Sequence, residues 1–441
     1  MTHCSLVVKD ENITVGQNLK RIRKELELKQ YSITGGKITR NLISLIENDK
    51  TPLYEDNAKI IAENMNSNAM EKNMNIYIEP EDILDPKRYD AKKDADVYIE
   101  GLRKRLEENH LEIRPEELQK VELFLNNWNL SDKKIIIYEL WADMYYKARD
   151  FENEHMYLTK AWEYSFMYPK RKGNYRIISN LISNCINSGK YEEAIRLGNL
   201  GLLSQKNLTD NDKKVFHYNN ALAYSYLNKF DDGLRELAIA KKYNLNANDK
   251  LERKILVSEG FCYVKKGEYG KALNAYNLAL RMLNTNKNYD ELCLIYTNMM
   301  EVFVKSKDSK KISEYLNLVI NLLHDLEDNS SYIIKIYLEI ANAYLFLKKY
   351  NSSEEYLLKA LKVTRINDEK DLHSKILLKL FNLYIEKNEI KKIDDLMEEF
   401  VQEVSNIQKD DRFVLLLNLI LYNKEEKNKD FVQKILNKGG K

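Results

Sequence analysis

Apolar and polar positions repeat with a period of about 40 residues through the C-terminal three-quarters of the chain. Each interval has a landmark residue, and the landmarks follow one another at 39 to 41 residues: Phe151, Tyr191, Phe230, Tyr269, Ser309, Tyr350 and Ile390. The residue six positions before the landmark is aromatic in six of the seven intervals. A fixed period of this length is typical of a helical solenoid, in which each unit buries its apolar face only against its neighbours.

Each landmark is expected to lie at the turn between two helices. Counted back from it, positions −13, −9, −6 and −2 of the first helix are predicted to share one side and form the core. Positions −15, −11, −8 and −4 lie about 160° around the helix. These four, called the inner positions below, are predicted to line a concave groove.

The inner positions carry a mixture of Asn, aromatic and basic side chains. An Asn side chain both donates and accepts, so a row of them can hold the main chain of an extended peptide. Aromatic pockets would then choose side chains, and basic groups would hold a carboxylate. The predicted peptide-binding residues are Arg176, Asn180, Asn219, Tyr226, Phe261, Lys265, Asn298 and Asn342. An incidental role for the Asn residues stays open, because the chain is rich in Asn throughout.

The N-terminal segment has a different and more compact pattern. Apolar residues recur at helical spacing over 15–26, and a second short helix is expected to begin near Gln30. Thr39 is placed to cap a third helix over 40–47, and a further helix over 55–65 closes the segment.

This segment resembles the Xre/Cro-like helix-turn-helix family in LKRIRK at 19–24, in Gln30 and in ITRNLISLIEN at 38–48. The resemblance implies that the third helix reads DNA. The whole chain has a net charge of only +2, but residues 15–50 contain eight Lys/Arg against four Asp/Glu, which suits phosphate contacts. The predicted DNA-binding residues are Gln30, Lys37, Thr39, Arg40, Asn41 and Ser44. A solvated helical hairpin is the alternative.

The segment that follows is interpreted as a connector. The polar run up to residue 75 has no strong period, and Pro80 and Pro86 are expected to stop any helix there. A charged helix is expected over 90–108, either as a rigid spacer or as part of a dimer interface. The predicted domains are 1–66 for DNA binding, 67–112 as connector and linker helix, and 113–441 as repeat domain with C-terminal capping helices.

Composition favours a helical protein and indicates no catalytic chemistry. Only five prolines occur, none of them after residue 169. The four cysteines are far apart and are expected to be reduced packing thiols, and the six histidines show no metal-binding spacing. We therefore expect no enzyme activity, no catalytic or metal-binding residue and no cofactor. No secretory signal is evident and the longest apolar run, 413–422, is too short to span a bilayer, so no membrane association is expected.

The repeat pattern resembles tetratricopeptide repeats. The expected fold is therefore all-α, with an N-terminal helix-turn-helix domain followed by a right-handed tetratricopeptide-repeat α-solenoid. This order of domains resembles the RRNPP family of quorum-sensing regulators. The resemblance implies a cytoplasmic, homodimeric transcription regulator whose binding to a double-stranded DNA operator is controlled by a short signalling peptide. A repeat scaffold that docks a protein partner, or a phosphatase-type controller of a response regulator, is the alternative.

Overall fold

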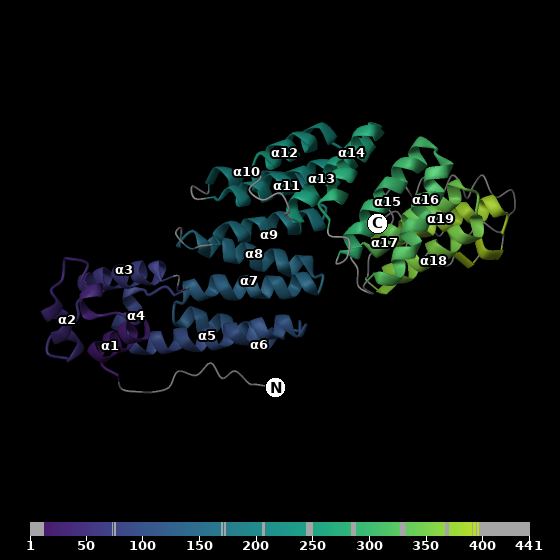
Figure 1. The fold of residues 1–441 in the computed structure, drawn as a ribbon. Coiled ribbons are helices and arrows are strands. Elements are labelled where there is room, and N and C mark those ends of the chain that lie inside the picture. The colour runs from purple at the N-terminus through teal and green to yellow at the C-terminus, as the bar shows by residue number, and fades with distance from the viewer. Residues whose placement is uncertain are drawn as a thin grey trace. The chain divides into compact units, whose positions relative to one another are not determined.

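The computed structural model describes residues 13–396 apart from short gaps at 73, 75, 169–170, 172, 205–207, 244–249, 284–287, 327–331, 367–369, 390 and 394. The C-terminal helices expected beyond residue 411 lie outside these residues. The described residues form helices and turns without any strand (Figure 1). The chain divides into two compact units, 1–223 and 224–441, which are described one at a time.

The first unit opens with a small helical bundle. Its elements are α1 (Val15–Glu25), the 3₁₀ turn η1 (Gln30–Ile33), α2 (Arg40–Glu47), α3 (Glu55–Glu71) and α4 (Pro80–Leu84). The second helix expected near Gln30 is thus a single 3₁₀ turn. Soon after η1 the chain turns at Gly35 and Gly36. Both residues have positive φ, which glycine adopts without steric strain. Thr39 caps α2 as expected, because its hydroxyl accepts a hydrogen bond of 3.2 Å from the Leu42 amide.

The expectation that Pro80 and Pro86 stop any helix is wrong. Pro80 is the first residue of α4, and Pro86 is the first residue of α5 (Pro86–Glu107). A first-turn amide has no partner inside its helix, so proline loses nothing there and its fixed φ favours the helix start. Helix α5 then packs along its length. Its Tyr89 belongs to the core of the N-terminal bundle, and residues from Ala91 to Leu102 belong to the core of the repeats that follow.

Six helices follow α5 in the first unit, and α11 is the last of them. They are α6 (Pro115–Asn127), α7 (Ser131–Lys147), α8 (Phe151–Ser165), α9 (Asn174–Asn187), α10 (Tyr191–Ser204) and α11 (Asp210–Tyr226). Neighbouring helices from α6 to α10 pack against one another along the chain. The buried Trp141 lies edge-on to Tyr157 at 5.1 Å between ring centroids, so aromatic side chains fill the space between α7 and α8.

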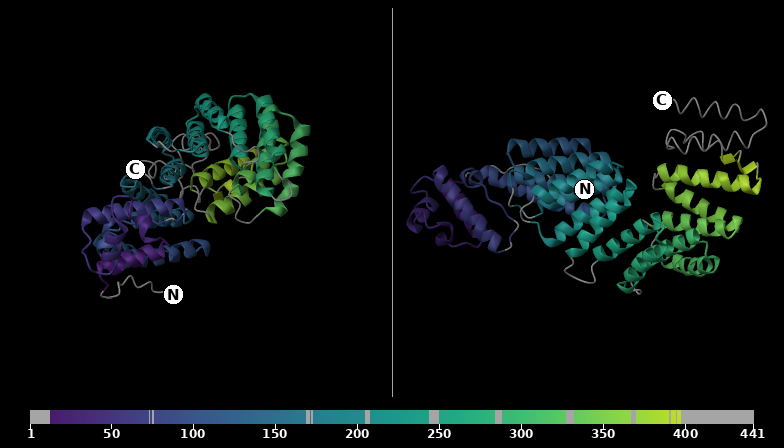
Figure 2. Two further views of the ribbon diagram at one scale, coloured as in Figure 1. Left: turned by 60° about the vertical axis from the view of Figure 1, so that its left-hand side comes forward. Right: turned by 90° about the horizontal axis from the view of Figure 1, so that it is seen from above.

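The second unit repeats the same arrangement, and Figure 2 shows both units from two further sides. Its helices are α12 (Phe230–Lys242), α13 (Lys250–Lys265), α14 (Tyr269–Arg281), α15 (Tyr289–Ser306), α16 (Ser309–Leu322), α17 (Ile333–Phe346), α18 (Tyr350–Ile366) and α19 (Lys370–Lys387), with the 3₁₀ turn η2 (Leu323–Asp325) after α16. Within each pair the two helices pack closely, as α13 does with α14 and α17 with α18. The all-α, tetratricopeptide-like repeat fold expected from the sequence is confirmed.

The landmark residues have one shared structural position. Every landmark from Phe151 to Tyr350 is the first residue of the second helix of its pair. The residue two positions earlier, predicted to belong to the core, instead has positive φ in all seven intervals: Arg149, Gly189, Asn228, Gly267, Lys307, Lys348 and Asn388. The first helix has already ended there, so helical periodicity no longer places this side chain. It forms the left-handed turn that reverses the chain.

Candidate nucleic-acid interface and ligand-binding face

The N-terminus of α2 presents a group of polar side chains to solvent. Lys37, Thr39, Arg40 and Asn41 are exposed, and Ser44 one turn further on is half-buried. All of them come from α2 or from the turn that precedes it. The structure therefore brings five of the six predicted DNA-contacting residues onto one short, continuous stretch of surface.

Gln30 is placed differently, in a polar network that holds α2 against α1. The buried Glu47 at the end of α2 accepts hydrogen bonds from Arg23 Nε at 2.5 Å and Arg23 Nη2 at 2.9 Å. Gln30 Nε2 donates to the same carboxylate at 2.9 Å. Burial acts to raise the pKa of Glu47, but the hydrogen bonds from Arg23 and Gln30 outweigh it, so this pKa lies below its ordinary value. The Gln30 amide thus orients α2 in the described structure.

Two exposed residues near α2 were not among the predicted contacts. Tyr31 is 62% exposed, and the Lys29 ammonium lies 6.0 Å from the centre of its ring. An exposed aromatic ring beside a cation is able to stack on a sugar or base. In the sequence, Tyr31 stands inside a short polar turn. Helical periodicity does not identify such a residue as a possible contact.

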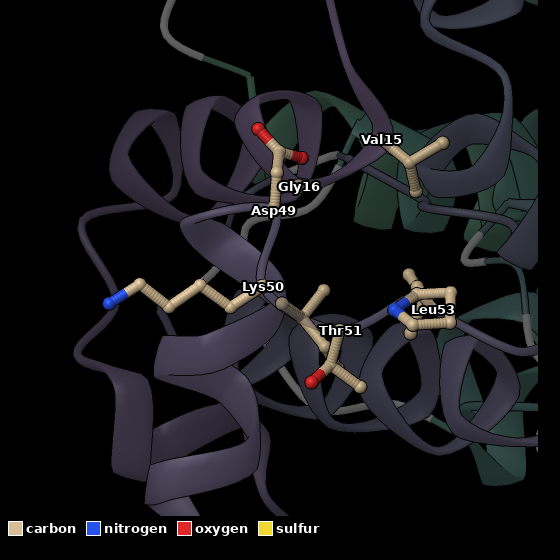
Figure 3. Close-up of a pocket in the computed structure, with 8 residues that line it drawn as sticks. Val15, Gly16, Asp49, Lys50, Thr51 and Leu53 are labelled. Carbon is tan, nitrogen blue, oxygen red and sulfur yellow. The ribbon is translucent and has the colours of Figure 1, made fainter.

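A cavity of about 290 Å³ lies between the start of α1 and the turn after α2 (Figure 3). Its lining includes Val15 and Gly16 from α1, and Asp49 and Leu53 from the segment after α2. Asp49 accepts a hydrogen bond of 2.8 Å from the Thr14 hydroxyl, which fastens the two segments together. In Figure 3 the Lys50 side chain extends away from the other labelled residues, so its ammonium is available to the surface next to α2.

A buried ion network joins the N-terminal bundle to the repeats of the first unit. We call it the junction network, and its members are Glu79, Asp82, Arg88, Lys92 and Asp132. Arg88 donates to Glu79 and Asp82, and Lys92 Nζ lies 2.7 Å from Asp82 and 3.0 Å from Asp132. Burial acts to lower the pKa of Lys92, but Asp132 and Asp82 outweigh it and raise this pKa above its ordinary value.

The junction network also reaches the backbone on both sides. Arg88 Nε donates to the carbonyl of Trp128 at 3.1 Å, and its Nη2 donates to the carbonyl of Asn129 at 3.0 Å, both in the turn between α6 and α7. On the other side, the amide of Asn18 in α1 donates to the carbonyls of Asp82 and Ile83 at 2.8 and 2.9 Å. The bundle that carries α2 is therefore bonded to the first repeat helices through groups that are buried or half-buried.

The inner positions of the first unit form closed polar pairs. Arg176 Nη2 lies 3.1 Å from Asp143 Oδ2, and Asn219 Nδ2 donates weakly to the Ser179 hydroxyl at 3.5 Å. Asn219 is buried and Asn180 is half-buried. Burial raises the pKa of the Asp143 carboxyl, and Arg176 partly opposes this shift. The predicted residues of this unit thus lie on α9 and α11, and Arg176 and Asn219 bond to polar groups of residues that were not predicted.

The inner positions of the second unit are more strongly charged. Glu301 of α15 lies 3.9 Å from the ammonium groups of both Lys265 and Lys305, which is at the limit of an ion pair. Lys335 Nζ donates to Asn298 Oδ1 at 2.7 Å, and Asn298 is buried. Asn342 is bonded at both ends, because its Nδ2 donates to Glu339 at 3.2 Å and its Oδ1 accepts from Lys379 at 3.0 Å.

The two predicted aromatic residues differ in exposure. Tyr226, near the end of α11, is 58% exposed. Phe261 of α13 is half-buried, edge-on to Phe230 at 6.4 Å, and the Lys265 ammonium lies 5.1 Å from the centre of its ring. Phe261 therefore forms part of the packing between helices and also lies next to a cation.

Burial shifts the titration of two inner groups of α17 in opposite directions. It lowers the pKa of the Lys335 ammonium, which Glu301 and Glu339 only partly oppose. It raises the pKa of the Glu339 carboxyl, and the nearby Glu301 adds to this effect. The prediction from sequence missed Glu301, Glu339 and Lys379, although all three are at inner positions. Glu301 and Glu339 are acids, whereas the predicted set contains Asn, aromatic and basic side chains.

The described part of the chain contains no group of three or more His, Cys, Asp or Glu side chains arranged to hold a metal ion. Cys185, Cys262 and Cys293 are buried and free, and burial raises the pKa of each thiol. Within the described ranges, the helices are all too short or too polar to cross a lipid bilayer.

Comparison with known proteins yields likenesses of fold only. The sequence matches no protein-family model and no curated protein. Among solved structures, apo RapI shares 14% identity over 63% of this chain and 99% of its own, with a TM-score of 0.49. Bacillus thuringiensis PlcR in complex with the peptide PapR7 and DNA shares 16% identity over 64% of this chain and 98% of its own, with a TM-score of 0.38.

Human IFIT1, a dimer solved with PPP-AAAA, shares 13% identity over 100% of this chain and 98% of its own, with a TM-score of 0.44. These structures were solved with different ligands or none, and values this low carry no argument about function. The class of protein that this chain's own helices define is an all-α protein of tetratricopeptide-like repeats with an additional N-terminal helical bundle.

Proposed function

We propose that this protein is a DNA-binding transcription regulator whose operator binding is controlled by a short peptide held at the inner positions of its repeats. The observation that carries the proposal is the capped helix α2, whose N-terminal residues Lys37, Thr39, Arg40 and Asn41 are exposed together. A recognition helix meets base edges with its N-terminal residues. Arg pairs well with guanine and Asn with adenine in the major groove.

The polar contacts around α2 support this function because they fix the helix without using its exposed end. Arg23 and Gln30 hold Glu47 at the C-terminal end of α2, away from Arg40 and Asn41. Base recognition needs a side chain whose backbone is already positioned, since ordering it on binding would cost affinity. The neighbouring Lys29, Tyr31 and Lys50 would then contact the phosphate and sugar backbone.

Control by a ligand requires that the repeats and the bundle be mechanically connected. The junction network supplies that connection in the first unit, because Arg88 bonds both to α4 and to the turn between α6 and α7. A change in how the repeat helices pack would act on the bundle through these bonds. A homodimer on two DNA half-sites and a cytoplasmic location belong to the same proposal, and no catalytic step is required.

The test is selection of duplex DNA from a random pool by the full chain, followed by binding measurements on the selected sequence. Arg40→Ala is expected to weaken binding about 10- to 100-fold, which corresponds to loss of one bidentate base contact. Arg103→Ala is the matched control, because Arg103 is exposed on α5 and pairs only with Glu100 in the same helix. Equal affinity of Arg40→Ala and the wild type would contradict the base-reading role. Failure to select any sequence would favour the scaffold alternative.

A further inference from the structure

The second unit has many charged residues at inner positions of four consecutive first helices, and six of them act on one another electrostatically. They are called the charged face below and are Lys265, Glu301, Lys305, Lys335, Glu339 and Lys379. Ion pairs near 4 Å and mutual electrostatic effects connect them from α13 to α19. Four ammonium groups face two carboxylates, so the face has an excess of positive charge in the absence of a ligand.

Two of the ammonium groups are held by amides instead of carboxylates. Lys335 donates to Asn298 at 2.7 Å, and Lys379 donates to Asn342 at 3.0 Å. The two residues of each pair are 37 positions apart, so the same bridge is made one repeat further along the chain. An amide oxygen fixes the direction of an ammonium group but does not cancel its charge. The bridges therefore orient two cations and leave their charge available.

We propose that the charged face binds its ligand through carboxylate groups held by Lys335 and Lys379, with Asn298 and Asn342 positioning the two ammonium groups. This inference rests on the proposed function, in which the ligand is a short peptide, and it specifies that the peptide is acidic. It also changes the role of the two Asn residues. They position the lysine ammonium groups and do not bind the peptide main chain, because both polar ends of Asn342 are already bonded.

The surroundings of Lys335 explain why an anion is favoured. Glu301 and Glu339 face it electrostatically, as does the like charge of Lys265, but Asn298 accepts its hydrogen bond. Burial lowers the pKa of this ammonium group, which means that its charge is poorly compensated. A ligand carboxylate at hydrogen-bonding distance would supply the missing counter-charge. Charge-assisted bonds of this kind are among the stronger ones in proteins.

The spacing of the two bridges sets the spacing of the anionic groups. Lys335 and Asn342 are seven residues apart on α17, which is on the order of 10 Å along the helix axis. That distance equals about three residues of an extended peptide. A peptide with an acidic side chain about three residues from a second carboxylate, such as its own C-terminus, matches this spacing along α17.

The test is peptide selection by the immobilised full chain from a random heptapeptide pool. The pool is made in two forms, one with free and one with amidated C-termini, and retained peptides are identified by mass spectrometry. We expect the wild type to retain acidic peptides about tenfold over neutral ones, the factor that one charge-assisted bond supplies. The double variant Lys335→Met and Lys379→Met should lose this preference and still retain neutral peptides.

Two further variants make the result specific. Lys359→Met is the matched control, because Lys359 is a lysine of α18 paired with Glu355 four positions before it, away from the inner positions. It should retain acidic peptides as the wild type does. Asn298→Leu should lower the ratio of acidic to neutral peptides, a readout that general damage to the fold would not change selectively. Far-ultraviolet circular dichroism of each variant confirms that its helices are formed.

The outcomes separate the two proposals. Retention of peptides without any acidic preference, or an unchanged preference in the double variant, would overturn the charged-face inference and leave the peptide-controlled function standing. Retention of no peptide at all by the wild type would instead contradict the proposed function itself, and the inference would fall with it.

Discussion

Arg88 is the residue whose removal should most damage the first unit. It is buried, with 6% of its surface exposed, and it has four polar partners. Two are the carboxylates of Glu79 and Asp82, and two are the carbonyls of Trp128 and Asn129. Arg88→Met keeps an unbranched apolar stem close to that of arginine and removes all of these bonds. The variant therefore isolates the polar contribution from the packing contribution.

The expected cost follows from what the substitution leaves behind. Asp82 is fully buried and would keep only Lys92 as a charged partner. Removing one member of a buried ion pair costs about 3–5 kcal/mol, because the other charge stays desolvated. Each carbonyl left without a donor adds about 1 kcal/mol, partly offset where water can enter. We expect Arg88→Met to lower the free energy of unfolding by about 4 kcal/mol.

Tryptophan fluorescence during urea unfolding is the assay that suits this region. The three tryptophans of the chain are Trp128, Trp141 and Trp162, so the signal arises from the helices next to the junction network. Trp128 also provides one of the two carbonyls that Arg88 contacts. The fluorescence transition should shift to markedly lower urea in Arg88→Met, and the change in its midpoint multiplied by the slope gives the lost free energy.

Arg103→Met is the control for this measurement. Arg103 is on the same helix, but it is exposed and pairs with Glu100 within one turn, an interaction worth well under about 1 kcal/mol. A loss below about 1 kcal/mol in Arg88→Met, or equal losses in the two variants, would show that the junction network contributes no more than a surface pair. The coupling role given to it above would then lose its physical basis.

Two further predictions concern burial and close packing. Burial raises the pKa of the Glu154 carboxyl from its ordinary value of 4.5 to about 7. The wild type should therefore lose stability relative to Glu154→Gln as pH rises from about 5 to 8, by at most about 3 kcal/mol. Thermal melts of the two proteins at each pH measure this difference, and parallel pH profiles would refute the prediction. A Cβ on Gly16 would lie 2.1 Å from the Ile46 carbonyl oxygen, so Gly16→Ala should destabilise the N-terminal bundle by about 1–3 kcal/mol. Gly101→Ala, with open space around it, should be neutral or stabilising in the same melts.

The repeat architecture could be predicted from sequence because the signal is redundant. Each helix pair buries apolar side chains against the next pair, so the same spacing returns even where one landmark is Ser309. The landmark is the first residue of a helix in every described case, a regularity that packing imposes on each unit alike. The cap of α2 by Thr39 was predictable for a similar reason, since it depends only on residues three positions apart.

Features that depend on the ends of elements were harder to predict. Position −2 was assigned to the core by extending helical periodicity past the point at which the helix stops. The left-handed turn there accepts Arg, Asn and Lys as well as Gly, so no single residue type marks it. The sequence predicts helix breaks at Pro80 and Pro86, because proline is common both just before a helix and just after one. Only the helix that follows each proline shows that it stands at a helix start.

The partners of polar groups could not be derived from the sequence at all. Asn298 and Asn342 are predicted at inner positions, but the lysines that bond to them are 37 residues further along the chain, on other helices. Which of several long side chains reaches an amide depends on rotamers and on the offset between helices, and neither is encoded in the residue pattern. The same limit concealed the bond between Gln30 and Glu47, which ties a predicted DNA contact to the inside of the bundle.

The contrast between the two units decides where a ligand carboxylate would bind. In the first unit Arg176 already has a carboxylate partner, Asp143 at 3.1 Å, so an incoming anion would have to displace one of equal charge. In the second unit Lys335 and Lys379 have neutral partners, and a carboxylate would add to their existing bonds. Exchange of one ion pair for another brings little free energy, whereas adding a carboxylate to an ammonium group that is bonded to a neutral amide brings more. A basic residue at an inner position is therefore an anion site only where its neighbour one repeat away is an amide.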